Sequence, residues 1–145
     1  ACYPILPLGV VVLHLVGRAD AVPTFWLVVL PPTLACHALT TVFRSWPPWV
    51  SDQTDGARPE RSVVESLNRW VSDHASIRAN TFPSGHAAST AAVALALWHV
   101  GPLWGVAFGW LAGSVAVATV LLRYHYTTDT LLGLGLAVAS YLTLG

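Results

Sequence analysis

The sequence predicts an all-α fold, a polytopic bundle of transmembrane helices, and three observations lead to that prediction. First, 54% of the 145 residues are hydrophobic and only 10% are charged, with a mean hydropathy of +0.60. Soluble domains contain roughly 25% charged residues, so lipid is the expected surrounding for most of this chain. Second, several apolar runs approach the roughly 20 residues that a helix needs to cross a bilayer. Third, the charged residues gather in one central stretch, as expected of a loop between spans.

Five apolar runs are candidate spans: residues 4–17, 22–43, 86–101, 103–122 and 126–144. Pro31 and Pro32 fall inside the second run. A membrane bundle tolerates them because neighbouring helices can satisfy the carbonyl groups that proline leaves free. The sequence contains no methionine. We therefore expect residues 1–145 to be a single membrane-embedded domain that is truncated at its N-terminus, with six spans in the full protein.

Residues 45–80 are expected to form an extramembrane loop within that domain. Apolar residues recur at helical spacing in residues 61–72, which predicts an amphipathic helix lying at the membrane interface. Trp46, Trp49 and Trp70 fit the aromatic belt found at that depth. The chain has two cysteines without metal-type spacing and a formal net charge of zero. The charge balance excludes a nucleic-acid partner held by excess positive charge.

Counting membrane crossings brings the polar span ends together. The second span ends at one face, the third leaves from that face, the fourth returns to it, and the fifth leaves from it again. Six arginines lie on that side or in its loop, and only Arg18 lies on the other, which by the positive-inside rule favours the cytoplasmic face. The residues that share the face are Arg44, Ser84, His86, Arg123, His125 and Asp129.

Pro83, Ser84, Gly85 and His86 stand directly before the third span. Serine is a favoured N-cap, and glycine lets backbone N–H groups approach a ligand closely. A helix N-terminus with free N–H groups binds anions such as phosphate, and His86 is placed there to transfer a proton. The plain alternative is a capped helix with an interfacial histidine.

A second polar segment runs from Arg123 to Asp129. His125 and Asp129 are four positions apart, so on a helix they share a face and the carboxylate can orient the imidazole. A histidine held by a carboxylate is a standard arrangement for a nucleophile or base. The alternative is a surface ion pair with Arg123. Ionisable residues at the mouth of an apolar bundle favour the functional interpretation.

Taken together, the segment 80–86 (Asn-Thr-Phe-Pro-Ser-Gly-His), Arg123 and the His125…Asp129 pair resemble the type 2 phosphatidic acid phosphatase superfamily, in its Arg-Tyr-His-Tyr variant branch. That superfamily usually adds a motif of lysine, six residues, arginine and proline. Here His37 and Arg44 stand at that spacing, while Arg58 precedes a proline within the loop. Arg44 is the preferred match and Arg58 the alternative. His37 is either a part of this motif or an ordinary buried histidine bonded to a carbonyl.

The resemblance implies a membrane-embedded lipid phosphate or diphosphate phosphatase. His125 would be the nucleophile that forms a phosphohistidine, Asp129 its orienting partner, and His86 the acid and base. Phosphate would be bound by Arg44, Ser84, Gly85 and Arg123, with His37 and Arg58 as further candidates. No metal or other cofactor is expected. The implied partners are the lipid bilayer and a lipid phosphate or polyprenyl diphosphate, and the implied location is a bacterial inner membrane with the site on the periplasmic side.

Two rival functions stay open. A headgroup phosphotransferase would use the same site but would pass the phosphoryl group to a lipid or sugar alcohol instead of water. A non-catalytic transport or scaffold subunit would retain a decayed site, which the missing lysine makes conceivable. The sequence does not choose among lipid phosphates and does not predict an oligomeric state.

Overall fold

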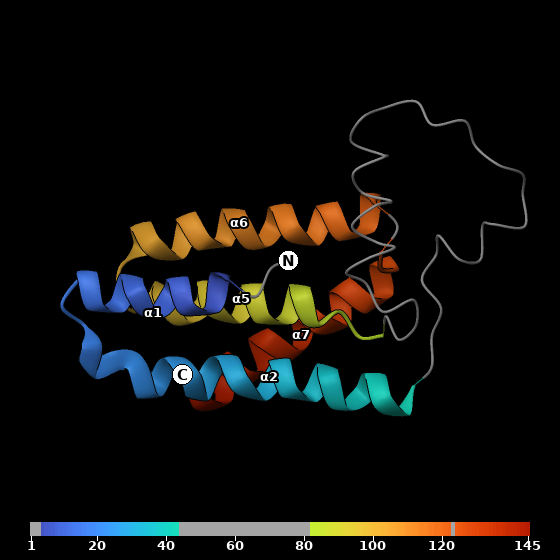
Figure 1. Cartoon of the computed structure of the whole chain (residues 1–145), viewed down its shortest axis with the longest axis horizontal. Coiled ribbons are helices and arrows are strands. Elements are labelled where there is room, and N and C mark those ends of the chain that lie inside the picture. Colours follow the sequence, from blue (N-terminus) through green and yellow to red (C-terminus); the bar gives the residue numbers. More distant parts are fainter. Residues whose placement is uncertain (1–3, 44–81, 123) are drawn as a thin grey trace, which may run out of the picture.

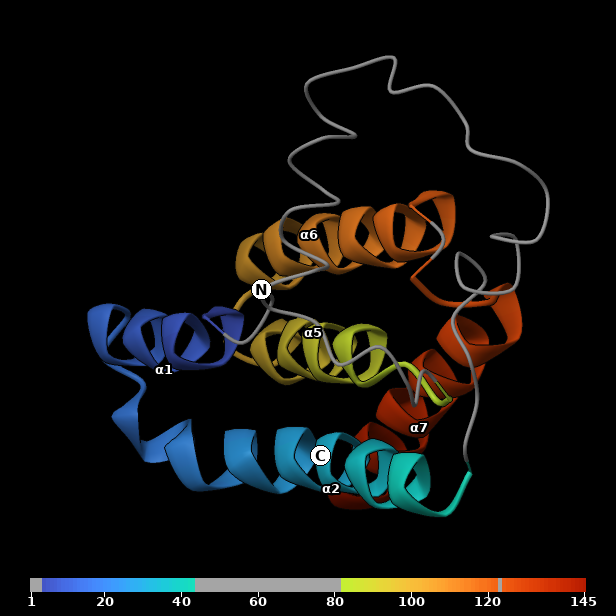
Figure 2. The same ribbon diagram turned by 45° about the vertical axis from the view of Figure 1, so that its right-hand side comes forward.

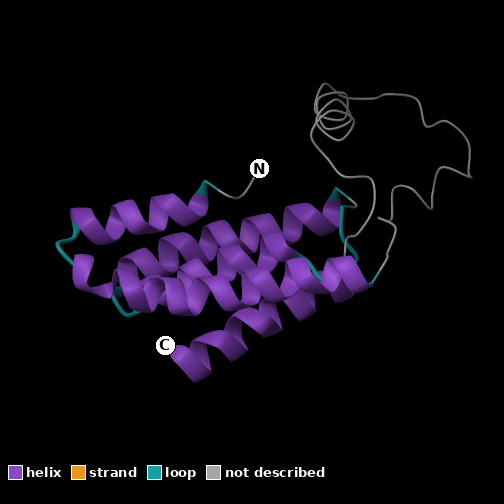
Figure 3. Cartoon of the chain, turned by 60° about the horizontal axis from the view of Figure 1, so that its bottom comes forward, coloured by secondary structure: helices purple, strands orange, loops and turns teal. Residues whose placement is uncertain are grey.

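The computed structural model describes residues 4–43, 82–122 and 124–145, and these ranges are helical nearly throughout, without a strand (Figure 3). The predicted all-α class is therefore confirmed for this part of the chain. The predicted loop at 45–80 and its amphipathic helix lie outside the described residues. The elements are α1 (Ile5–Leu15), the 3-10 turn η1 (Ala19–Ala21), α2 (Val22–Val42), α5 (Gly85–Trp98), α6 (Pro102–Leu121) and α7 (Thr127–Leu144).

Local sequence signals set the helix ends. α1 ends at Leu15 and is followed by Gly17, whose φ of 75° lies in the left-handed region, and the Arg18 N–H donates to the Leu13 carbonyl at 2.8 Å. This bond closes the last turn in the manner of a Schellman motif. α6 begins at Pro102 directly after Gly101, because proline is favoured in the first turn of a helix and cannot continue the preceding one. The observed helices thus follow the five apolar runs within a few residues.

α5 is the central helix, and it contacts α1, α2, α6 and α7 (Figures 1 and 2). α6 and α2 lie on opposite sides of it, and α7 crosses the bundle obliquely. Its buried side chains are mostly small, which lets the neighbouring helices approach its backbone. They are Ala87, Ala88, Ser89, Thr90, Ala92, Val93, Ala94 and Leu97.

α2 runs without interruption through Pro31 and Pro32. A proline lacks the N–H that would bond the carbonyl four residues earlier, so Pro32 leaves the Val28 carbonyl without its helical donor. The buried Ser140 hydroxyl of α7 donates to this carbonyl oxygen at 2.9 Å. A neighbouring helix therefore satisfies the freed carbonyl, as the sequence predicted for a membrane bundle.

Among the described residues, two helical stretches have the length and composition to cross a membrane. Residues 19–42 have a mean hydropathy of 1.5, and α6 has a mean hydropathy of 1.7. Only 33% and 22% of these stretches are buried inside the bundle, whereas a soluble core helix is mostly buried. α6 exposes Leu103, Trp110 and Leu121 at 76%, 80% and 75%. This outward apolar surface supports membrane association, and the predicted number of five spans stays a prediction.

Candidate active site

Four helix ends meet at one end of the bundle. They are the C-terminal ends of α2 and α6 and the N-terminal ends of α5 and α7, at the right of Figure 1. This arrangement brings Ser84, His86, His125 and Asp129 together, as the count of crossings predicted. Two of the helices offer their N-terminal, positive dipole ends to this region.

The N-terminus of α5 is built as the sequence predicted. Ser84 is the N-cap, and its hydroxyl oxygen accepts a hydrogen bond from the Ala87 N–H at 3.3 Å. Before it, the Phe82 ring lies edge-on to Phe43 at the end of α2, with 5.9 Å between ring centroids. The segment that leads into α5 thereby packs against the end of α2.

His37 of α2 lies beside this helix start. Its Nδ1 is 2.7 Å from the Thr33 carbonyl oxygen, which can only accept, so Nδ1 carries the proton of this bond. A Cβ added to Gly85 would lie 3.5 Å from His37 Cε1. His37 is therefore adjacent to the N-terminal end of α5. It is bonded to a carbonyl, as one interpretation of the sequence held, but it is exposed and not buried. Its part in the phosphate motif stays a prediction.

His125 is held in the turn between α6 and α7. The backbone N–H groups of Tyr124 and His125 both donate to the Thr119 carbonyl oxygen, at 2.9 and 3.1 Å. The side chain of His125 is buried, and its Nδ1 is 3.8 Å from Asp129 Oδ2. That distance is longer than a hydrogen bond, and such bonds often shorten only when substrate is bound.

Asp129 is buried in the first turn of α7. Its Oδ2 accepts from the Tyr126 backbone N–H at 3.1 Å, and its Oδ1 accepts from the Thr128 hydroxyl at 3.4 Å. The positive end of the helix dipole favours a negative charge at this position. Asp129 thus both caps α7 and presents a carboxylate oxygen to His125.

The rings of His86 and His125 lie close together. Their centroids are 5.9 Å apart, with an angle of 57° between the ring planes. Two imidazoles at this separation are near enough to act on one substrate, one as a nucleophile and the other as an acid or base.

Sequence reasoning missed Gly133, at which α7 contacts the first turn of α5. The Ser84 N–H donates to the Asp129 carbonyl oxygen at 3.0 Å. One turn further along α7, a Cβ added to Gly133 would overlap the Ser84 carbonyl oxygen and lie 3.3 Å from the Ala88 nitrogen. The spacing in the sequence could have indicated this contact, because Gly133 follows Asp129 by four positions and therefore shares its helix face.

The remaining predicted phosphate ligands lie outside the described residues. These are Arg44, Arg58 and Arg123. Their roles, and the choice between Arg44 and Arg58, stay predictions.

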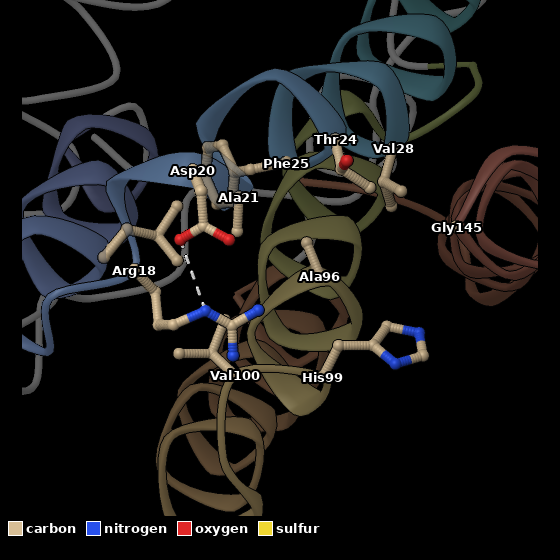
Figure 4. A pocket seen from close by; sticks show the side chains of 11 residues that line it. Arg18, Asp20, Ala21, Thr24, Phe25, Val28, Ala96, His99, Val100 and Gly145 are labelled. Carbon is tan, nitrogen blue, oxygen red and sulfur yellow. Dashed lines mark hydrogen bonds and ion pairs between the residues drawn. The ribbon is translucent and has the colours of Figure 1, made fainter.

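A cavity of about 230 Å³ lies at the other end of α5, between the α1–α2 turn and the C-terminal end of α7 (Figure 4). Its lining includes His99 and an ion pair of 3.3 Å between Arg18 and Asp20. Asp20 balances the charge of Arg18, and both partners are solvent-exposed. The cavity contains none of the predicted site residues, and the histidine pair at the opposite end has the better chemistry for catalysis.

Comparison with known proteins agrees with the geometry. A PA-phosphatase related-family protein of Dictyostelium discoideum is 38% identical to this chain over 58 residues, which are 40% of the chain and 10% of that protein. No solved structure matches the chain significantly. The family pattern of the PAP2 superfamily matches residues 21–144, which include every described residue of the site. The chain therefore belongs to the PAP2 superfamily, the type 2 phosphatidic acid phosphatase superfamily.

Proposed function

We propose that this protein is a metal-independent phosphatase of lipid phosphates or diphosphates that acts through a phosphohistidine. The observation that carries the proposal is the pair of imidazoles, His86 and His125, whose centroids are 5.9 Å apart beside a buried carboxylate. His86 lies in the first turn of α5, whereas His125 lies in the turn between α6 and α7, so the two rings have different neighbours. They can therefore take different roles in one reaction.

His125 is the nucleophile in this proposal. Asp129 lies on the Nδ1 side of the ring, so Nδ1 carries the proton and Nε2 has the lone pair that attacks phosphorus. The N–P bond forms as the bond from phosphorus to the leaving oxygen breaks. His86 donates a proton to that oxygen, which departs as an alcohol or, from a diphosphate, as a monophosphate.

Hydrolysis of the phosphohistidine reverses the role of His86. Its imidazole, now neutral, takes a proton from water while the water oxygen attacks phosphorus. The N–P bond breaks, inorganic phosphate leaves, and His125 regains its lone pair. Each histidine ends the cycle in its starting state.

The phosphoryl oxygens would be held by the start of α5. Ser84 presents a hydroxyl and Gly85 a backbone N–H group at the positive end of the helix dipole. Arg44 and Arg123 are proposed to complete the positive field, with His37 and Arg58 as further candidates. Arginine suits this role because its planar group donates two parallel hydrogen bonds to phosphate. No metal is assigned to the mechanism.

The apolar outer surface of the bundle supports a substrate that carries its phosphate in the headgroup layer and its tail in lipid. Phosphatidate and polyprenyl diphosphate both fit this description. We propose that the protein is integral to a bacterial inner membrane, with the site on the periplasmic side.

The test is phosphate release by purified protein in detergent from dioctanoyl phosphatidate and from a polyprenyl diphosphate, in EDTA. His125→Ala should abolish release. The matched control is His14→Ala, because His14 is an exposed histidine of α1 bonded to its own helix at the Val10 carbonyl. Unchanged release by His125→Ala would overturn the proposal, and so would a strict need for a divalent ion.

The same assay separates the rival functions. Phosphate release that requires an added alcohol, with formation of a new phosphodiester, would identify a headgroup transferase. No turnover of either substrate, with or without alcohol, by folded protein would favour a non-catalytic subunit.

A further inference from the structure

We infer that Gly133 is a positioning residue for the reaction, because it sets the spacing between α5, which carries His86, and α7, which begins directly after His125 and carries Asp129. This inference rests on the proposed function. Gly133 itself has no side chain with which to contact substrate. It acts through the distance at which α7 packs against α5.

The contact at Gly133 is closer than any side chain would permit. A Cβ at this position would overlap the carbonyl oxygen of Ser84 and would lie 3.3 Å from the backbone nitrogen of Ala88. Both neighbours are backbone atoms of the first turn of α5, so neither can move aside by rotating a side chain. An added methyl group must therefore separate the two helices.

This contact lies within one turn of the reacting groups on both helices. On α5, Ser84 precedes His86 by two positions. On α7, Gly133 follows Asp129 by four positions, and the Asp129 carbonyl accepts the 3.0 Å hydrogen bond from the Ser84 N–H. Separation of the helices at Gly133 would stretch this bond and change the distance between the two imidazoles. A displacement on the order of 1 Å can lower a rate by about 100-fold.

The other glycines of α6 and α7 supply controls for this close contact. A Cβ at Gly135 would meet nothing within 4 Å, and the same holds for Gly113. A Cβ at Gly105 would meet backbone, at 2.9 Å from the Trp98 Cα, but at the opposite end of α5. Gly105 therefore tests the effect of a helix–helix clash remote from the site.

The experiment compares Gly133→Ala, Gly105→Ala and Gly135→Ala with the parent protein. Each is purified in detergent, the monodisperse fraction is quantified, and kinetics are expressed per mole of that fraction. We expect Gly133→Ala to lower kcat at least tenfold and to change KM less than threefold. Gly135→Ala should stay within twofold of the parent in both constants. Gly105→Ala should lower the melting temperature with kcat also within twofold.

A second readout separates positioning from general loss of structure. The kcat/KM value is measured for dioctanoyl phosphatidate, whose alkoxide leaving group needs a proton, and for p-nitrophenyl phosphate, whose leaving group needs little help. Misplacement of His86 relative to His125 should reduce kcat/KM at least threefold more for the alkyl ester. Equal losses for the two esters would overturn the inference, as would a kcat for Gly133→Ala within twofold of the parent.

If Gly133→Ala alone gives no monodisperse protein, the substitution is repeated together with Gly135→Ala and Gly113→Ala, which add helix propensity in open space. Failure to fold in this background too would assign Gly133 to folding alone and overturn the inference. His125→Ala serves as the reference for the proposed function. If that variant is active, the proposed mechanism fails, whereas an inactive His125→Ala with an unimpaired Gly133→Ala refutes only the positioning role.

Discussion

The hydroxyl of Ser140 on α7 donates a 2.9 Å hydrogen bond to the carbonyl oxygen of Val28 on α2. The two residues are 112 positions apart in the chain, and both are buried. The bond compensates for the missing N–H of Pro32. It joins the oblique helix α7 to α2 beside the cavity at the end of the bundle opposite the histidine pair, since Val28 also lines that cavity.

Ser140→Ala should therefore destabilise the protein without changing its chemistry. The Val28 carbonyl would be left without a donor in the interior, which costs about 0.5–2 kcal/mol in a membrane bundle. The measurement is thermal unfolding in detergent, with kcat determined on the folded fraction. Ser114→Ala is the matched control, since the exposed Ser114 hydroxyl donates to Trp110 of its own helix. Equal stability of the two variants would contradict this account.

The activity lost in His86→Gln should depend on the leaving group of the substrate. Glutamine can still donate hydrogen bonds, but it cannot transfer a proton. The kcat for a lipid phosphate should therefore fall on the order of 10²–10⁴-fold. The fall in kcat should be much smaller for p-nitrophenyl phosphate, whose leaving group needs little protonation. His99→Gln at the opposite end of α5, where the His99 ring stacks on Tyr141, is the control and should retain full activity. A uniform loss for both substrates would argue that His86 binds phosphate and transfers no proton.

Asp129→Asn separates the two roles of this carboxyl group. An asparagine can accept a hydrogen bond from the Tyr126 N–H and so keep the cap of α7. The melting temperature should therefore change little. It cannot hold His125 in the required tautomer, so kcat should fall on the order of 10²–10⁴-fold. Asp20→Asn, which removes an exposed carboxylate at the opposite end, is the control. Retained activity in Asp129→Asn would limit Asp129 to capping.

Gly85→Ala should fold normally but bind substrate less tightly. An added Cβ would meet only ordinary van der Waals neighbours, with His37 Cε1 at 3.5 Å and Cys36 Cβ at 3.7 Å. It would, however, stand between the free N–H groups of α5 and an approaching phosphate. We expect KM to rise roughly tenfold, which is about 1.4 kcal/mol of lost contact. An unchanged KM, compared with Gly135→Ala as control, would show that phosphate does not approach the helix at this point.

The parts of the fold that depend on local sequence were predictable. The apolar runs, Pro102 and Gly17 determine where helices begin and end, and these signals act within a few residues. The convergence of His86 with His125 was also predictable, because the number of crossings between them brings the chain back to the same end of the bundle. Helix bounds and catalytic candidates thus follow from periodicity and counting.

The close contacts could not be predicted in the same way. Gly133 and Ser140 look unremarkable in an apolar span, and their partners, Ser84 and Val28, are 49 and 112 positions away. Which small residue touches which backbone depends on the rotation and crossing of α7, and these are set by the packing of the whole bundle. The arginine ligands stay predictions because they lie outside the described residues.

The small side chains of the α5–α7 interface have a consequence for rigidity. Burial of alanine or glycine freezes no side-chain rotamers, whereas burial of a long side chain costs up to about 2 kcal/mol of conformational entropy. Ala88 of α5 and Ala137 of α7 are both fully buried, and neither has a side-chain rotamer to lose. The helices that carry His86 and Asp129 thus approach each other backbone to backbone at Gly133, and thermal motion of intervening side chains contributes little to the distance between these helices.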